Sequence, residues 1–213
     1  MNAKGTKIKG SIPEHYDQGL APNIFQDFGR DLSRRIVALN PHKVLELAAG
    51  TGVVTRILRD TLNASCQLTA TDIVDPMLSF AKSKFDANES IEFEVADAQK
   101  LPFEDNSFDA LVSQFGVMFF SNKERSFEEA SRVLSANGHY IFNVWCSFEH
   151  NSFSRITHET AARFFQDNPP PFYDTPFSYH NAEKITGSLN ATGFVNISVH
   201  EQMVEKTVED YDT

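Results

Sequence analysis

Three carboxylates stand at or near the ends of short apolar runs, where an α/β protein keeps the side chains that bind its ligand. Glu46 lies inside the run 44–47, Asp72 ends a second run at 66–72, and Asp97 follows a third at 91–95. An acid within a buried parallel strand needs a specific reason, because burying an unpaired carboxylate is unfavourable. A carboxylate at the end of a second strand can accept hydrogen bonds from both hydroxyls of a ribose. The sequence therefore predicts a nucleoside-binding role for Asp72.

Asp72 also has a second interpretation, as a cap for the helix expected after it. Asp75-Pro76 already offers that helix an acidic N-cap and a proline suited to its first turn. Met77 and Phe85 then fall on the buried stripe of the helix. We therefore expect Asp72 to be available to a ligand.

A turn rich in small residues, AAGTG at 48–52, follows the first acidic strand, and a helical pattern over 53–62 follows the turn. Such a turn can serve only to connect strand and helix, or it can let a ligand approach the backbone. A dinucleotide fingerprint would need a third glycine inside the helix, and a phosphate-binding loop would need Lys and Ser or Thr after the last glycine. Val53 occupies the position after Gly52, so neither pattern is present.

Composition narrows the class of protein. A chain of 213 residues is long enough for one sizeable core. The net charge of −10 and the lack of a dense Lys/Arg cluster argue against a nucleic-acid partner, and Arg34 and Arg35 fit the solvated side of a helix. The two cysteines, Cys66 and Cys146, have no metal-type spacing, and no run reaches the roughly 18 apolar residues of a membrane span. We expect a cytoplasmic protein without a metal site.

The acid and small-residue turn at 46–52 resemble the first motif of class I S-adenosylmethionine-dependent methyltransferases, with Ala48 where a glycine is common. The segment VADAQKLPFEDNSFD, at 95–109, closely resembles the small-molecule C-methyltransferases of ubiquinone and menaquinone biosynthesis. The resemblance covers about 24–145. It implies a Rossmann-like α/β fold, a mostly parallel sheet flanked by helices in the order 3-2-1-4-5-(7)-6.

The same resemblance implies S-adenosyl-L-methionine as cofactor, S-adenosyl-L-homocysteine as product and a small, partly apolar or aromatic molecule as methyl acceptor. It places Asp97 at the adenine amino group and Tyr16 over the methionine end. The full set of cofactor contacts that it implies is Tyr16, Glu46, Ala48, Gly50, Gly52, Asp72, Ile73, Met77, Asp97, Ala98, Gln114 and Phe115. No catalytic base can be assigned from the sequence, and His150 and Tyr16 are the remaining candidates.

The outer segments are expected to frame this core. We expect one domain, with a lead-in and cap helix at 1–40, a cofactor-binding core at 41–146, and substrate-side helices with a last strand at 147–213. The lead-in is polar up to Pro22 and is expected to be loosely ordered, and a helical pattern begins at Ile24. Further strands are expected at 108–113 and 139–146, and Asn137-Gly138 is expected to stop the helix between them. The alternation FVNISV predicts a sixth strand at 194–199. Because a seventh strand is not visible, the sequence favours a truncated chain. The run Asn168-Pro169-Pro170 resembles an N-methyltransferase signature but stands at the wrong place.

Other function classes remain open. A protein that binds S-adenosylmethionine without catalysis would share every feature above. A nicotinamide-dependent oxidoreductase would use Asp72 for a ribose but give Asp97 no ligand. An RNA or protein methyltransferase is disfavoured by the acidic charge and by the apolar segment after Gln114.

Overall fold

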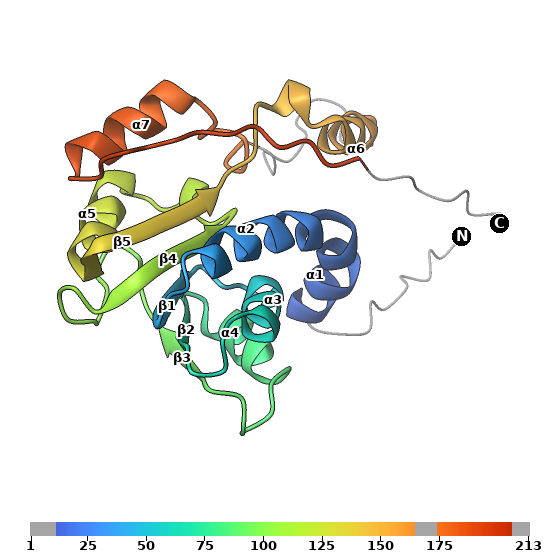
Figure 1. Ribbon diagram of the computed structural model, residues 1–213. Helices are drawn as coiled ribbons and strands as arrows, with labels where there is room; N and C mark the ends of the chain where they lie inside the picture. The colour runs from blue at the N-terminus through green and yellow to red at the C-terminus, as the bar shows by residue number, and fades with distance from the viewer. Residues whose placement is uncertain (1–11, 165–173, 206–213) are drawn as a thin grey trace.

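The computed structural model describes residues 12–164 and 174–205, and its centre is a five-stranded parallel sheet (Figure 1). The strand order is β3-β2-β1-β4-β5, which confirms the order expected for the first five strands. Every paired neighbour in the sheet runs parallel. The strands are β1 Lys43–Leu47, β2 Gln67–Asp72, β3 Ile91–Val95, β4 Phe108–Gln114 and β5 Leu134–Asn143.

Helices cover both faces of the sheet. In Figure 1, α2, α3 and α4 lie on one side and α5 and α7 on the other, while α1 and α6 lie beyond the ends of β4 and β5. The helices are α1 Ile12–Leu20, η1 Ala21–Phe25, α2 Gln26–Ala38, α3 Val53–Thr61, α4 Asp75–Lys82, η2 Val117–Phe119, α5 Lys123–Val133, η3 Phe148–His150, α6 Ser152–Ala162 and α7 Ala182–Ala191.

The two-sided cover explains why β1 is apolar at consecutive positions. Side chains alternate across a strand, so Val44 packs with Leu32 of α2, and Leu45 and Leu47 pack with Ala130 of α5. All three β1 side chains are fully buried. Glu46 shares the parity of Val44 and therefore faces the side of α2 and α3.

The register brings the carboxyl ends of the strands to one edge. Leu47 pairs with Thr71, Asp72 pairs with Val95, and Gln114 pairs with Asn143. In an open parallel sheet, this edge is where ligands bind. The residues that follow these ends are the site described below.

The N-terminal expectation is wrong over 12–20. The sequence predicts a loosely ordered lead-in up to Pro22, but α1 is a helix whose Asp17 forms an ion pair with Lys84 next to α4. The helical path therefore starts before the pattern that begins at Ile24, and a π-helical turn joins α1 to α2.

The boundary between α5 and β5 also differs from expectation. The sequence predicts that Asn137-Gly138 stops the helix, whereas α5 ends at Val133 and β5 starts at Leu134. The pairing of β4 with β5 shifts between Phe108 and Ala110, which marks a bulge. A Cβ at Gly138 would lie 2.7 Å from Leu134 Cδ2, so the glycine serves a close approach within the strand.

The predicted sixth strand at 194–199 is wrong. Phe194 and Ile197 both pack on the cluster that contains Phe127 and Tyr179, whereas residues three apart in a strand would point to opposite faces. Asn196, between them, has a φ of 56°, in the left-handed region, which interrupts the extended backbone. No strand forms over 174–205, so β5 is the edge of the sheet within the described chain.

Among the described helices, none has both the length and the apolar character needed to cross a bilayer.

Candidate functional site at the carboxyl edge of the sheet

The turn after β1 is held in an unusual backbone conformation. Ala48, Gly50 and Gly52 have φ values of 55°, 56° and 79°, all left-handed. The alanine carries about 1 kcal/mol of strain that a glycine would avoid. A Cβ at Gly52 would lie 2.9 Å from Ala81 Cβ, so this glycine lets α3 and α4 approach closely. A Cβ at Gly50 would meet nothing within 4 Å, so the backbone there faces open space that a ligand can enter.

Glu46 lies beneath this turn with only 2% of its surface exposed. The hydroxyl of Thr55, on α3, donates a 2.6 Å hydrogen bond to Glu46 Oε2. Burial is the main cause that raises the pKa of Glu46 to about 7; the Thr55 bond lowers it in part, and the charge of Asp72 raises it further. The side chain therefore changes charge near neutral pH, and a cation in the turn would favour its ionised form.

Asp72 connects the turn to the start of α4. Its Oδ2 accepts a 2.8 Å hydrogen bond from the Gly50 N–H, and its Oδ1 accepts one of 2.8 Å from the Val74 N–H. The expected cap by Asp75 is wrong, since Val74 is the N-cap and makes no side-chain cap bond, while Pro76 does lie in the first turn. Asp72 therefore helps to start α4, and each of its oxygens retains a further lone pair for a ligand.

The side chains beside Asp72 leave an apolar surface open. Ile73 is 63% exposed although it is a large aliphatic residue. Met77, one turn into α4, is half-buried. Single exposed apolar groups are ordinary on a protein surface, but this one directly follows Asp72.

Asp97 follows β3 in a loop that folds back on itself. Its Oδ1 accepts hydrogen bonds from the Gln99 N–H at 2.9 Å and from the Gln99 side-chain amide at 3.0 Å. No hydrogen bond reaches Oδ2 from the described residues. Ala98, next to it, is buried.

The end of β4 carries an aromatic cluster, which comprises Phe25, Phe28, Phe115 and Trp145. Phe115 has a left-handed φ of 51°, which is strained for an aromatic residue. Its ring stacks on Trp145 with centroids 3.8 Å apart and an angle of 6°. Phe28 meets both rings edge-on, at 5.3 and 5.6 Å, and Phe25 lies 5.9 Å from Phe115.

Gln114 ties this cluster to the N-terminal helices. Its amide nitrogen donates a 3.0 Å hydrogen bond to the Phe25 carbonyl oxygen. Its Oε1 is buried and has no hydrogen-bond partner in the described chain. A buried acceptor without a partner is unfavourable, and a donor on a ligand would remove that penalty.

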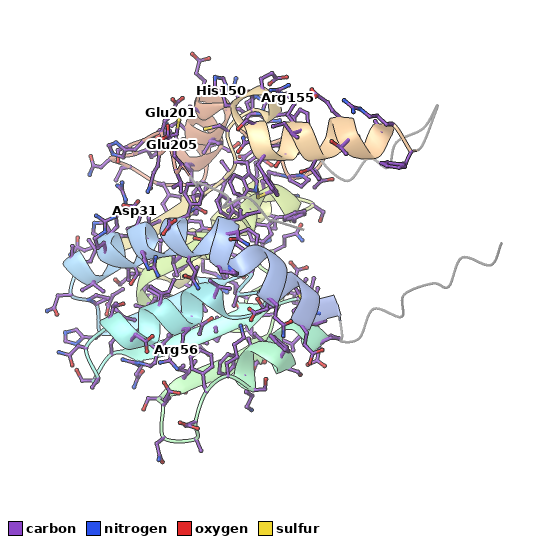
Figure 2. The ribbon with its side chains drawn as sticks, turned by 90° about the vertical axis from the view of Figure 1, so that its right-hand side faces the viewer. Asp31, Arg56, His150, Arg155, Glu201 and Glu205 are labelled. Atoms are coloured by element: carbon purple, nitrogen blue, oxygen red, sulfur yellow. The ribbon has the colours of Figure 1, made fainter. Side chains whose placement is uncertain are left out.

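The two candidate bases are not brought to this cluster by any described contact. Figure 2 shows His150 beside the start of α6, and its Nδ1 lies 2.8 Å from the Ser147 hydroxyl. Tyr16 lies on α1, and its side chain is outside the described set. Neither role is tested, and both stay predictions.

Two hollows in the surface lie away from the carboxyl edge. One, of about 480 Å³, is lined at the opposite ends of the strands by residues that include Pro41, His42 and Asp109. The other, of about 300 Å³, lies beside Arg56 of α3, which Figure 2 shows below Asp31 of α2. Neither hollow is lined by a glycine, and neither lies where the parallel strands end, so we place the site at the carboxyl edge.

The charged surface agrees with the sequence-based interpretation of the arginines. Arg34 and Arg35 both form ion pairs with Asp31, at 3.0 and 2.7 Å. Among the described residues, no group of three or more His, Cys, Asp or Glu side chains could hold a metal ion.

Sequence reasoning missed three contributors to the site. In the sequence, Thr55 is one residue of the helix expected at 53–62. The signal that could have identified it is a hydroxyl on the helix face that the fold buries. Gln99 reads as part of a connecting loop. Phe28 reads as core, and only the packing of α2 against β4 brings it to Phe115.

Comparison with known proteins finds matches over the central part of the chain. The family model described as a methyltransferase domain matches residues 45–142. A demethylmenaquinone methyltransferase of Thermotoga maritima is 38% identical over 136 residues, which is 61% of this chain and 56% of that protein. A ubiquinone/menaquinone biosynthesis C-methyltransferase of Rickettsia felis is 39% identical over 118 residues, 52% of this chain and 47% of that protein. The chain thus spans about half the length of the curated relatives it matches.

Solved structures support the fold. A putative S-adenosyl-L-methionine-dependent methyltransferase of Methanococcus maripaludis superposes with a TM-score of 0.64 at 20% identity, over 84% of this chain and 81% of that one. At this level of identity the likeness concerns the fold alone.

Proposed function

The chain belongs to the class I S-adenosylmethionine-dependent methyltransferases through residues 45–142, and from this premise we propose that it transfers a methyl group to a small, partly apolar or aromatic molecule. The family implies S-adenosyl-L-methionine as cofactor. The observation that carries the proposal is that Glu46, Asp72 and the open turn at Gly50 meet on the edge that also holds Asp97 and Phe115.

The donor set fits the cofactor. A ribose presents hydroxyl donors, and Asp72 has lone pairs left for them. An adenine presents an amino donor and a flat apolar face, and Asp97 Oδ2 together with Ile73 and Ala98 can serve these. The amino acid end carries a cation, and an ionised Glu46 below the turn would favour it.

When bound, S-adenosylmethionine supplies a methyl group on a sulfonium that is already a good leaving group. The protein then needs chiefly to position the acceptor and to exclude water, and proximity of this kind lowers barriers by roughly 7–11 kcal/mol in favourable cases. The aromatic cluster around Phe115 offers an apolar surface at the end of β4 for these two tasks. Gln114 Oε1 offers one fixed acceptor for a donor group beside it.

An aromatic acceptor is the class we favour. The rings of Phe25, Phe28, Phe115 and Trp145 form one contiguous cluster, and aromatic rings bind well to such surfaces by stacking or edge contact. The names of the relatives from Thermotoga and Rickettsia, both of quinone biosynthesis, support the same class. The proposal includes the cytoplasmic location expected from the sequence.

Calorimetric titration tests the cofactor. S-Adenosylhomocysteine and NADH are titrated into the wild type and into Asp72→Asn, Asp97→Asn and the control Asp109→Asn at the opposite edge. We expect the wild type to bind S-adenosylhomocysteine, the first two variants to bind it more weakly, and the control to match the wild type. Binding of NADH alone would refute the proposal in favour of an oxidoreductase.

Transfer of labelled methyl groups from S-adenosylmethionine tests catalysis. The acceptors are a reduced demethylnaphthoquinone, a catechol and an imidazole amine, with radioactivity measured in each product. Transfer to an aromatic acceptor is the expected result. Binding of S-adenosylhomocysteine without transfer to any acceptor would favour the cofactor-binding protein without catalysis.

A further inference from the structure

We propose that Gln99 is a positioning residue that fixes Asp97 so that one carboxylate oxygen is left free for the adenine amino group of the cofactor. This inference rests on the proposed function, because it assumes that the cofactor carries an adenine. It assigns a task to a side chain in the loop after β3 that is not among the cofactor contacts expected from the sequence.

The amide of Gln99 is held on both sides. Its nitrogen donates to Asp97 Oδ1 at 3.0 Å, and the Gln99 backbone N–H donates to the same oxygen at 2.9 Å. Its oxygen accepts from the Ser121 hydroxyl at 2.9 Å and from the Asn122 backbone N–H at 2.8 Å. Both ends of the amide are therefore engaged.

These partners also fix which end of the amide is which. A backbone N–H can only donate, so the atom that faces Asn122 must be the oxygen. The reverse arrangement would place the amide nitrogen against the Asn122 N–H and the oxygen against a carboxylate. Nε2 therefore faces Asp97, and two donors meet at Oδ1. Oδ2 is left for a donor from outside.

The anchor for Gln99 is itself well ordered. Asn122 caps α5, and its Oδ1 accepts from the Arg125 N–H at 2.9 Å. The far part of the same loop is held independently, because Arg132 donates to the carbonyl oxygens of Leu101 and Phe103 at 3.0 and 2.7 Å. Glu129 adds a 2.8 Å bond from the Leu101 N–H. Loss of the Gln99 side chain should therefore leave the path of the loop intact and free only the Asp97 side chain.

Two substitutions of Gln99 separate the parts of this arrangement, and two substitutions elsewhere serve for comparison. Gln99→Glu keeps an acceptor for Ser121 and Asn122 but replaces the donor at Asp97 by a like charge. Gln99→Met keeps the length and removes both polar ends. Ser121→Ala removes one of the two outer anchors, and Gln67→Glu makes the same change of charge at an exposed position on the amino edge of the sheet.

The test compares two ligands by calorimetry: S-adenosylhomocysteine and its analogue with hydrogen in place of the adenine amino group. We expect Gln99→Glu and Gln99→Met to lower the affinity for S-adenosylhomocysteine on the order of tenfold, as loss of a hydrogen bond to a charged group does. The affinity for the analogue should change less than about twofold. Ser121→Ala should give a smaller loss in the same sense, and Gln67→Glu should match the wild type. Thermal unfolding of each ligand-free variant checks that the fold is kept.

Equal weakening of the two ligands would overturn the proposal, since it would show that Gln99 supports the loop rather than the Asp97 carboxylate. Unchanged binding of S-adenosylhomocysteine in both Gln99 variants would also overturn it. If the wild type bound neither ligand, the proposed function would fail together with this inference. That failure is seen in the wild type alone and is therefore distinct from a failure seen only in the Gln99 variants.

Discussion

The two edges of the sheet each contain an aspartate that binds two backbone N–H groups. At the amino edge, Asp109 Oδ2 accepts from the N–H groups of His42 and Lys43 at 2.8 and 2.9 Å. At the carboxyl edge, Asp72 accepts from those of Gly50 and Val74, both at 2.8 Å. The local chemistry of the two carboxylates is therefore nearly the same.

Their surroundings differ. Around Asp72 there is a buried second acid, Glu46, an open space over Gly50 and an exposed Ile73. Around Asp109 there is a hollow whose lining residues include no other carboxylate. The comparison teaches that a carboxylate bound to the backbone does not mark a site by itself. We expect a site where an open backbone and a second acid lie beside the carboxylate, as they do around Asp72.

The largest expected effect separates the two aspartates directly. Asp72→Ala should lower the affinity for S-adenosylhomocysteine by about a thousandfold, because it removes charged hydrogen bonds to the ligand and the anchor of the Gly50 turn. Asp109→Ala should lower stability by about 1–2 kcal/mol and leave affinity unchanged. Calorimetry and urea unfolding measure the two quantities. Equal loss of affinity in both variants would contradict the distinction between the edges.

The second effect concerns the buried acid that only the carboxyl edge has. The pKa of Glu46 is raised to about 7 from 4.5, so the folded state keeps a proton that the unfolded state loses in this interval. Stability should therefore fall as pH rises from about 4.5 to about 7, by about 3 kcal/mol at most. Glu46→Gln should remove this fall. Urea unfolding between pH 5 and pH 8 measures it, and parallel profiles for the two proteins would contradict the prediction.

A third comparison uses two left-handed glycines within the turn. Gly52→Ala should destabilise the protein by about 2 kcal/mol, since its Cβ would approach Ala81 Cβ to 2.9 Å at a φ of 79°. Gly50→Ala should cost about 1 kcal/mol, because the backbone is strained but the space is open. The second variant should nevertheless lose more cofactor affinity than stability. Urea unfolding measures the stability of both variants, and calorimetry measures their affinity for S-adenosylhomocysteine.

The smallest effect concerns the aromatic cluster. Phe28→Leu removes edge contacts to Phe115 and Trp145 and should lower stability by about 1 kcal/mol. Phe153→Leu, on an exposed position of α6, should stay within about 0.5 kcal/mol. Trp145 is the single tryptophan of the chain, so its fluorescence reports on this cluster alone. An emission maximum that Phe28→Leu leaves unmoved would contradict the contact.

The sequence alone predicted much of the core. Apolar runs fixed β1 to β4 to within about a residue or two, because a strand buried on both faces tolerates few polar residues. It failed at β5 and at 194–199. There, local alternation competes with a bulge at Gly138 and with the left-handed backbone of Asn196, and neither is visible in hydrophobic periodicity.

The positions of Asp72 and Asp97 at one edge were determined by the sequence, since parallel strands of similar length must end together. The partners of the acids were decided only by the tertiary structure. Thr55 reaches Glu46 because α3 packs on the face to which the parity of β1 directs the carboxylate. Gln99 reaches Asn122 because the loop after β3 lies along α5. Hydrogen bonds between distant segments depend on how layers pack, and no local pattern of residues encodes that distance.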